Sequence, residues 1–171
     1  MHMDSTADDT YIGTLITAAR MRIEEYIGRA LITQTITAAW DQLPDEYEIE
    51  LPRAVGSTTV TSVKVYADDD SSTTISSSNY HVSTYDEPAR VALLQNVSWD
   101  SGVSTLRTVN ALVAVYSTGY GASGTSVPGP ILAAIKETVR AWYDADVDEL
   151  ADADLPPVAR AMLSGYRIRN L

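Results

Sequence analysis

Residues 8–29 carry hydrophobic side chains at the spacing of one face of a helix. The stripe consists of Ile12, Leu15, Ile16, Ala19, Ile23, Tyr26 and Ile27, which recur every three or four residues. Asp8 and Asp9 suit the positive end of a helix dipole, and Gly28 is a common residue just beyond a helix end. The pattern predicts a long N-terminal amphipathic helix.

The chain from about residue 31 to residue 118 has the composition of β-structure. Thr, Val, Ser, Ile and Tyr dominate, and turn formers such as Pro44, Gly56 and Pro88 interrupt the runs. Val63 and Val65 alternate with more polar neighbours, as in a strand with one buried face. Candidate strands are 31–40, 47–51, 58–67, 73–76, 80–84, 89–95 and 107–117. The Asp-rich stretch 67–72 is interpreted as a hairpin turn whose side chains bond the local backbone.

Helical spacing resumes at Pro130, a favourable residue for a first helical turn. Ile131, Ala134, Ile135, Thr138 and Trp142 trace one face, and Leu132, Val139 and Tyr143 widen it. Pro156 and Pro157 then open a short last helix that reaches Tyr166. The pattern predicts an α+β fold: a helical bundle, made of the long N-terminal helix and C-terminal helices, with an inserted antiparallel β-rich region. We expect one domain over 1–171, helical at 8–29 and 130–167.

Charge and composition narrow the choice of function. The chain has 171 residues, of which 45% are hydrophobic, and a net charge of −11 from 23 acidic and 12 basic side chains. Such an excess of acids opposes the basic surface with which proteins neutralise phosphates. No run is long and apolar enough to predict a membrane helix or a signal peptide. Because cysteine is absent, thiolate catalysis and cysteine metal sites are excluded.

The stretch GYGASG places Gly119, Gly121 and Gly124 in the order G-x-G-x-x-G between a strand and a helix. In a dinucleotide site the third glycine lies in the first helical turn, and an acid ends the next strand. Here TSVPGP separates Gly124 from the helix, and the next acids lie in helical sequence. We interpret the stretch as a flexible loop whose glycines supply positive φ, and the three glycines as hinge candidates. A small nucleotide-binding enzyme is kept as an alternative.

Other candidate chemistry is weak. The acidic run that begins at Asp144 fails as a calcium loop, because Glu149 and Leu155 stand where glycine and glutamate are required. It is interpreted as a solvated loop, with a weak cation site as the alternative. His81 is interpreted as a strand residue, and Glu24 and Glu25 as neighbours on different helix faces. We therefore assign no catalytic, cofactor-binding or metal-binding residue, and expect no cofactor and no enzymatic activity.

Short motifs in a fixed order are more informative than any single one. They are AARMRIEEYIGRALITQT at 18–35, Trp40, LP at 51–52, NYHV at 79–82, PARV at 88–91, Trp99, YSTGYG at 116–121, VP at 127–128, AAI at 133–135, Tyr143 and YR at 166–167. In this order and spacing the chain resembles the bacteriophage head-tail connector (adaptor) family. The resemblance extends from about residue 8 to residue 167.

The resemblance implies a structural protein of the virion neck, made in the host cytoplasm during assembly. Family members form a ring, typically dodecameric, that joins the portal to a stopper or tail-terminator type neck protein and leaves a channel through which DNA passes without specific binding. The alternative within this class is another neck or tail-completion protein. The segment expected to dock on the portal maps to Tyr166, Arg167, Ile168, Arg169 and Leu171.

Two positions depart from the family pattern. The residues RAVG follow the LP at 51–52, where a proline-rich segment is usual, and the acidic run from Asp144 replaces an arginine. The departures concern the contacts of the β-rich insertion and of the acidic loop.

Overall fold

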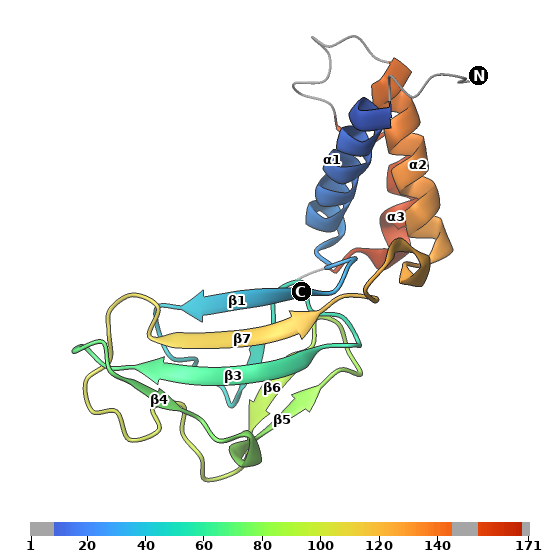
Figure 1. Cartoon of the computed structure of the whole chain (residues 1–171). Helices are drawn as coiled ribbons and strands as arrows, with labels where there is room; N and C mark the ends of the chain where they lie inside the picture. Colours follow the sequence, from blue (N-terminus) through green and yellow to red (C-terminus); the bar gives the residue numbers. More distant parts are fainter. Residues whose placement is uncertain (1–8, 145–153, 169–171) are drawn as a thin grey trace.

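The chain folds into a helical layer that stands on a β layer (Figure 1). The computed structural model describes residues 9–144 and 154–168. The helical layer holds α1 (Asp9–Ile27), α2 (Gly129–Asp144) and α3 (Pro157–Leu163), and a short 3₁₀ turn, Ser164–Tyr166, follows α3. The β layer contains every strand between α1 and α2. The α+β fold with a β-rich insertion in a helical bundle is thereby confirmed.

The helical layer has its own hydrophobic core. α2 packs against both α1 and α3, because its buried residues Ile131, Ala134 and Thr138 share one face. The core contains Ile23, Ile27, Leu31, Val127, Ile131, Ala134, Leu155, Ala159 and Leu163. Gly28 ends α1 with a φ of 69°, the left-handed conformation that glycine adopts without strain. The predicted positions of α1 and α2 are confirmed to within two residues at each end, and α3 ends at Leu163, where the chain continues as a 3₁₀ turn to Tyr166.

In the described part of the chain, seven strands form two antiparallel sheets. They are β1 (Gln34–Trp40), β2 (Glu48–Glu50), β3 (Thr59–Tyr66), β4 (Ser72–Thr74), β5 (Tyr80–Ser83), β6 (Arg90–Leu93) and β7 (Leu112–Thr118). The larger sheet has the order β1-β7-β3-β4 and the smaller one β2-β6-β5. Each observed strand coincides with one of the seven predicted runs, and the differences lie at the ends.

Both sheets share a second hydrophobic core. Val63 and Val65 of β3 and Leu112 and Ala114 of β7 meet Val91 of the smaller sheet in this core. In the central strand β7, buried and half-buried residues alternate, so the strand is apolar on both sides but fully buried on only one. The two cores have no residue in common.

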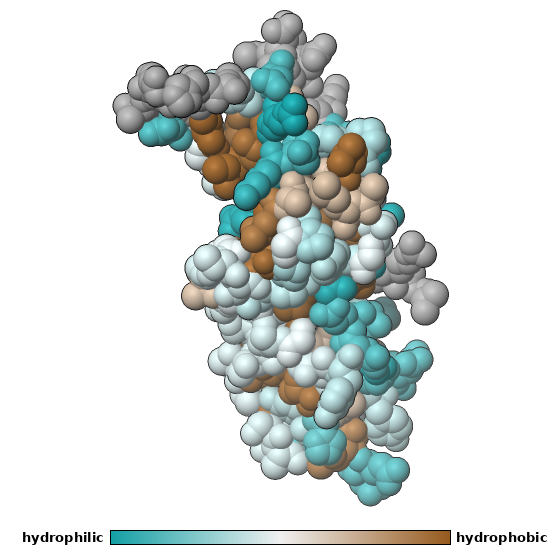
Figure 2. All heavy atoms as spheres, turned by 90° about the vertical axis from the view of Figure 1, so that its right-hand side faces the viewer, coloured by the Kyte–Doolittle hydropathy of each residue, from teal (hydrophilic) through white to brown (hydrophobic). Residues whose placement is uncertain are grey.

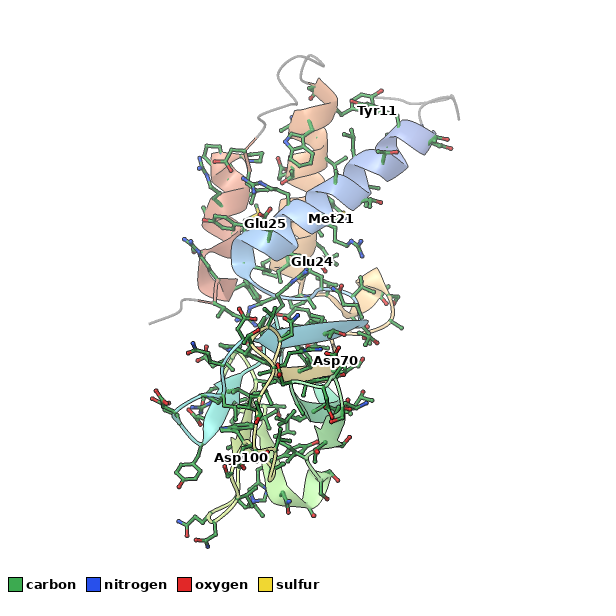
Figure 3. All side chains as sticks on the ribbon, turned by 90° about the vertical axis from the view of Figure 1, so that its left-hand side faces the viewer. Tyr11, Met21, Glu24, Glu25, Asp70 and Asp100 are labelled. Carbon is green, nitrogen blue, oxygen red and sulfur yellow. The ribbon has the colours of Figure 1, made fainter. Side chains whose placement is uncertain are left out.

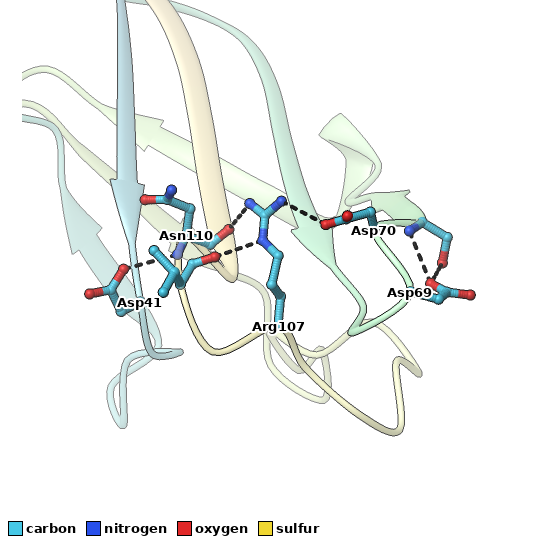
Figure 4. Close-up of polar contacts among 7 residues, drawn as sticks. Asp41, Asp69, Asp70, Arg107 and Asn110 are labelled. Carbon is cyan, nitrogen blue, oxygen red and sulfur yellow. Dashed lines mark hydrogen bonds and ion pairs between the residues drawn. The ribbon is translucent and has the colours of Figure 1, made fainter.

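The predicted strand 107–117 begins five residues too early. Arg107 lies instead in a loop at the far end of the β layer, where its Nε donates to the Val109 carbonyl (2.6 Å) and its guanidinium also donates to the Asn110 carbonyl (2.7 Å) and to Asp70 (3.2 Å) (Figure 4). Asn110 has a φ of 55°, which interrupts an extended chain. The hydrogen bonds of Arg107 hold this loop in a non-extended shape. Strand β7 therefore begins to pair with β1 and β3 only at Leu112.

The hairpin turn predicted at 67–72 is confirmed. Asp69 Oδ1 accepts bonds from the backbone N–H (3.0 Å) and the hydroxyl (2.5 Å) of Ser71 (Figure 4). These bonds favour the charged carboxylate and lower the pKa of Asp69. The turn joins β3 to β4.

Candidate functional site

A polar junction connects the helical layer to the β layer, and Glu24 is its centre. Glu24 lies near the end of α1 with only 4% of its surface exposed. Its Oε1 accepts from the Leu31 N–H (2.8 Å) and from the Gln34 amide (3.4 Å), and its Oε2 pairs with Arg53 (3.0 Å). Figure 3 shows Glu24 at the level where α1 meets the sheet. A buried carboxylate with this many donors fixes the turn between α1 and β1.

Arg29 is the second buried charge of the junction. Its Nε donates to the Tyr166 carbonyl, and its guanidinium donates to the Tyr120 hydroxyl (3.1 Å) and pairs with Glu87. The three partners belong to the C-terminal segment, to the loop after β7 and to the loop before β6. Burial raises the pKa of Tyr120, although the Arg29 charge opposes that shift. Arg29 therefore holds three distant segments together.

Arg53 stands at the first departure from the connector pattern, in the segment RAVG. Its φ is 61°, a left-handed conformation that is unusual for any residue but glycine, asparagine or aspartate. The Arg53 carbonyl accepts from the Ala30 N–H (3.0 Å) while its guanidinium reaches Glu24. In this chain Arg53 therefore connects the β-rich insertion to the helical layer.

The glycine loop after β7 packs closely on the chain before β1. Gly119 has a φ of 143°, and a Cβ atom there would lie 2.5 Å from the Ile32 carbonyl carbon and from the Thr33 nitrogen. At Gly121 a Cβ would lie 2.4 Å from the Ser126 hydroxyl. Gly124 has open space around it. The expectation that all three glycines supply positive φ is wrong: only Gly119 does so, whereas Gly121 is required by close packing.

The backbone amides of this loop bond to the protein itself. Tyr120 N–H donates to the Leu31 carbonyl (3.1 Å), and Val127 N–H donates to the Gly124 carbonyl (3.1 Å). A phosphate cradle presents such amides to its ligand. The geometry therefore disfavours the nucleotide-binding interpretation of GYGASG.

Below the buried charges, hydroxyl groups of the β layer form further buried hydrogen bonds. Thr118 Oγ1 accepts from the Val55 N–H (3.0 Å) and bonds the Thr58 hydroxyl (2.8 Å). The Tyr116 hydroxyl donates to the Pro52 carbonyl (2.5 Å). Burial raises the pKa of Tyr116 to about 12, with the Arg53 charge acting in the opposite direction. At neutral pH the phenol remains protonated and keeps its donor.

The predicted portal-docking segment lies against the end of α1. Ile168 N–H donates to the Ile27 carbonyl (2.9 Å), and the Arg167 guanidinium lies 5.3 Å from the centre of the Tyr26 ring. Tyr166 and Ile168 are half-buried, and Arg167 is exposed. Arg169 and Leu171 lie outside the described residues. The structure thus brings three of the five predicted interface residues together at one corner of the helical layer.

An open apolar groove separates α1 from α2 above the junction. Its volume is about 760 Å³, and hydrophobic side chains gather over the helical layer in Figure 2. Apolar residues lining it are Ile12, Ile16, Leu31, Ile32, Val127, Leu132, Ile135 and Val139. Arg20, Lys136 and Arg140 also line it, and within the described part of the chain none of the three has an ion pair. The broad face predicted for 130–143 is explained, since one side faces the core and another the groove.

The remaining candidate residues His81 and Glu25 lie apart from the junction and the groove. Among residues 9–144 and 154–168, no group of three His, Asp or Glu side chains has the geometry of a metal site. His81 lies exposed on β5, as predicted. Glu25 bonds Arg22 (3.0 Å) on the helix surface, away from Glu24.

The acidic run at 145–153, with its alternative cation site, lies outside the described residues. None of the described helices is long and apolar enough to span a membrane.

Sequence reasoning missed Glu24, Arg29 and Arg53 as members of one cluster. The available signal was the place of Glu24, which follows Ile23 and lies three residues before Ile27 in the apolar stripe. A carboxylate at the edge of such a stripe indicates a buried partner. The partners themselves came from segments that only the fold brings together.

Three solved structures share this fold. A chain in the virion of a native gene transfer agent (GTA) particle has a TM-score of 0.80 and 20% identity, covering 100% of this chain and 84% of that chain. A chain in the neck of an empty GTA particle computed with C6 symmetry has a TM-score of 0.75, 22% identity and the same coverage. A chain in the neck of the native GTA particle computed with C12 symmetry has a TM-score of 0.71 and 21% identity, covering 94% of this chain and 84% of that chain. No protein-family model and no curated protein matches the sequence.

Proposed function

We propose that this protein is a structural component of the neck of a tailed phage or phage-like particle, an adaptor ring that joins the portal to the tail or to the next neck protein. The observation that carries the proposal is the likeness of fold over the whole chain to chains of GTA virions and necks. The ordered motifs from residue 8 to residue 167, which resemble those of the head-tail connector family, support the proposal from the sequence. In this proposal residues 1–171 act as one connector domain.

The junction gives the proposed role a physical basis. In the proposed role the contact surfaces of the chain keep fixed relative positions, and hydrogen-bonded buried charges such as Glu24 and Arg29 help to fix them. Glu24 and Arg29 connect α1 to the β layer, to the loop after β7 and to the C-terminal segment. Gly119, Gly121 and Gly124, the hinge candidates, lie where β7 leaves the sheet for α2.

The segment from Tyr166 to Leu171 is proposed to dock on the portal. Arg167 is exposed at the corner where the segment meets α1 and offers a positive charge to an acidic partner. Because the Tyr166 carbonyl and the Ile168 N–H anchor the segment, a deletion that starts at residue 164 would also remove contacts of the fold. A shorter deletion or a single substitution can therefore test portal docking without removing contacts that the fold needs.

The test mixes the purified protein with the purified portal of its particle and examines the mixture by negative-stain electron microscopy. We expect a ring of additional density below the portal. Removing residues 169–171, or the substitution Arg167→Glu, should abolish it, while Tyr85→Ser at a 99% exposed site in the β layer should not. No ring with the wild-type protein would contradict the adaptor role, and binding to a different neck component would favour a stopper or tail-completion protein. Stabilisation by nucleotides would instead favour the enzyme alternative.

A further inference from the structure

A ridge of small and apolar side chains runs along the outer face of α3. Val158, Ala161 and Met162 are exposed and follow the i, i+3, i+4 spacing of one helix face. The exposed fraction is 57% for Val158 and 36% for Met162. Ala159 and Leu163, on the other side of the helix, are buried in the helical core. The ridge is therefore hydrophobic surface without a partner in the described monomer.

The ridge and the α1–α2 groove lie on different faces of the helical layer. The described residues that line the groove belong to α1, to α2 and to the loops at their base, and none belongs to α3. Figure 1 shows α3 behind α1 and α2, and Figure 3, a view from another side, shows α3 beside α1. One copy can therefore offer its ridge to one neighbour and its groove to another.

We propose that the α3 ridge of one copy packs into the α1–α2 groove of the next copy and forms the subunit interface of the ring. The inference rests on the proposed neck function and specifies which surfaces of the chain meet. Contact between unlike patches is heterologous, and it closes into a ring when the rotation between copies divides a full turn. A two-fold dimer, in contrast, would pair each patch with itself.

Shape and hydrophobicity favour a helix as the occupant of the groove. Side-chain ridges of one helix normally pack into the furrow between side chains of others. The groove volume of about 760 Å³ lies in the range of sites that bury several large apolar groups. Ile16 in the groove is 48% exposed in the monomer, so contact with Val158 or Met162 would remove apolar surface from water on both copies.

The distribution of charge also favours the α1–α2 groove as a contact surface between copies. Copies of a chain with a net charge of −11 repel one another, so they approach best where positive charge is concentrated. Arg20, Lys136 and Arg140 line the groove, three of only 12 basic residues in the chain, together with one acid, Asp144. Asp154 is exposed just before α3, and it already interacts with Arg160 (2.9 Å) and Arg22 (3.6 Å) of its own copy. The groove lining therefore carries more positive than negative side chains, which suits an acidic neighbour, whereas the carboxylate beside the ridge is already paired with arginines of its own copy and adds no attraction of its own.

The first test uses site-specific cross-linking, for which the natural absence of cysteine is suited. The double variant Ile16→Cys with Val158→Cys, mixed with the portal and oxidised, should give a ladder of covalent oligomers on a denaturing gel. Each single-cysteine variant should give monomer alone, because like positions do not meet. Dimers from a single-cysteine variant, or no ladder from the double variant, would overturn the proposal.

The second test uses complementation. Ile16→Asp damages only the groove, and Val158→Asp damages only the ridge; both sites are exposed, so the monomer should keep its fold. Each variant alone should lose self-association by about 30-fold or more, as for an interface hot spot. An equimolar mixture should regain one intact interface and form a one-to-one complex, detected by sedimentation, but no ring. Exposed Val109→Asp in the β layer is the matched control.

The outcomes separate this inference from the proposed function. If the Ile16→Asp protein and the Val158→Asp protein each form rings on the portal when tested alone, the ridge–groove contact is overturned. The adaptor role then remains intact. Absence of wild-type rings would contradict the adaptor role, and the cross-linking ladder at high protein concentration would then decide the contact by itself. The alternative occupant of the groove is the segment 1–8 of the same copy. In that case the Ile16→Cys thiol should react with a maleimide only after residues 2–8 are deleted. That result would also overturn the proposal.

Discussion

The β layer and the helical layer bury their hydrophobic side chains to different extents. In the β layer two sheets contribute to one core, and the central strand β7 is flanked by β1 and β3. In the helical layer α1 has 19 residues and α2 has 16, but α3 has only 7. At 1.5 Å per residue, α3 spans less than half the length of either long helix. None of the described residues that line the α1–α2 groove belongs to α3, and the groove is open.

This difference separates two physical roles within one chain. The core of the β layer is shared by two sheets, whereas the helical layer leaves apolar side chains exposed in the α1–α2 groove, the surface proposed above for assembly. The junction of Glu24, Arg29 and Arg53 is polar, and the Glu24 carboxylate and the Arg29 guanidinium each bond several specific partners, whereas Arg53 bonds Glu24 through one terminal nitrogen and its buried Nε has no partner among the described residues. Contact surfaces on the helices thus keep a defined position relative to the β layer.

The largest expected effect is at Gly119, where the two layers are joined. Gly119→Ala would place a Cβ 2.5 Å from the backbone of Ile32 and Thr33, at a φ of 143° that alanine rarely adopts. We expect a loss of about 4 kcal/mol in the free energy of unfolding, from strain and overpacking together. Chemical denaturation measures it.

Gly124→Ala is the matched control, because its Cβ would meet open space. A change within about 1 kcal/mol is expected there. Equal losses at the two glycines would show that close packing is not what requires Gly119.

Glu24→Ala should break the junction while leaving both cores intact. It removes the acceptor of the Leu31 N–H and the partner of Arg53, and we expect a loss of about 3 kcal/mol. If the junction couples the layers, we expect one unfolding transition for the wild type and two separate transitions for the Glu24→Ala protein. Near-ultraviolet and far-ultraviolet circular dichroism would follow the two layers during heating.

Glu25→Ala is the control for this substitution, since Glu25 forms only an exposed pair with Arg22. A loss below about 0.5 kcal/mol is expected. A Glu24→Ala protein that unfolds in one transition, with the stability of the Glu25→Ala protein, would contradict the role of the junction.

The smallest expected effect is at Tyr116, whose hydroxyl bonds the Pro52 carbonyl. Tyr116→Phe should lose about 1 kcal/mol at pH 7. Because the folded-state pKa is raised from 10.0 to about 12, the stability that comes from the protonated phenol is complete below pH 10 and is lost as the pH rises toward 12. The difference between wild type and variant should therefore narrow over that interval.

Stability curves of both proteins between pH 7 and pH 12 test this. Tyr85→Phe, at a fully solvated position, should run parallel to the wild type. A constant difference between the Tyr116→Phe protein and the wild type would exclude the buried phenol as a source of alkaline instability.

Local patterns were sufficient to predict most elements. The three-to-four-residue spacing in α1 and the alternation at Val63 and Val65 report which side of an element is buried, and this is set by neighbours in sequence. The ends were less accurate where a distant group decides them. Strand β1 starts at Gln34 and not at residue 31, because Leu31 is buried in the helical core and its N–H bonds Glu24.

The sequence by itself determined the order of helices and strands, the acidic balance, and the absence of cysteine chemistry. Each follows from composition or from contacts between residues close in the chain. Only the tertiary structure brought Glu24 to Arg53 and Gly119 to Thr33, and left a groove between α1 and α2 that α3 does not cover. Those features join residues far apart in sequence, so no local period encodes them, and they hold both the junction and the surface proposed for assembly.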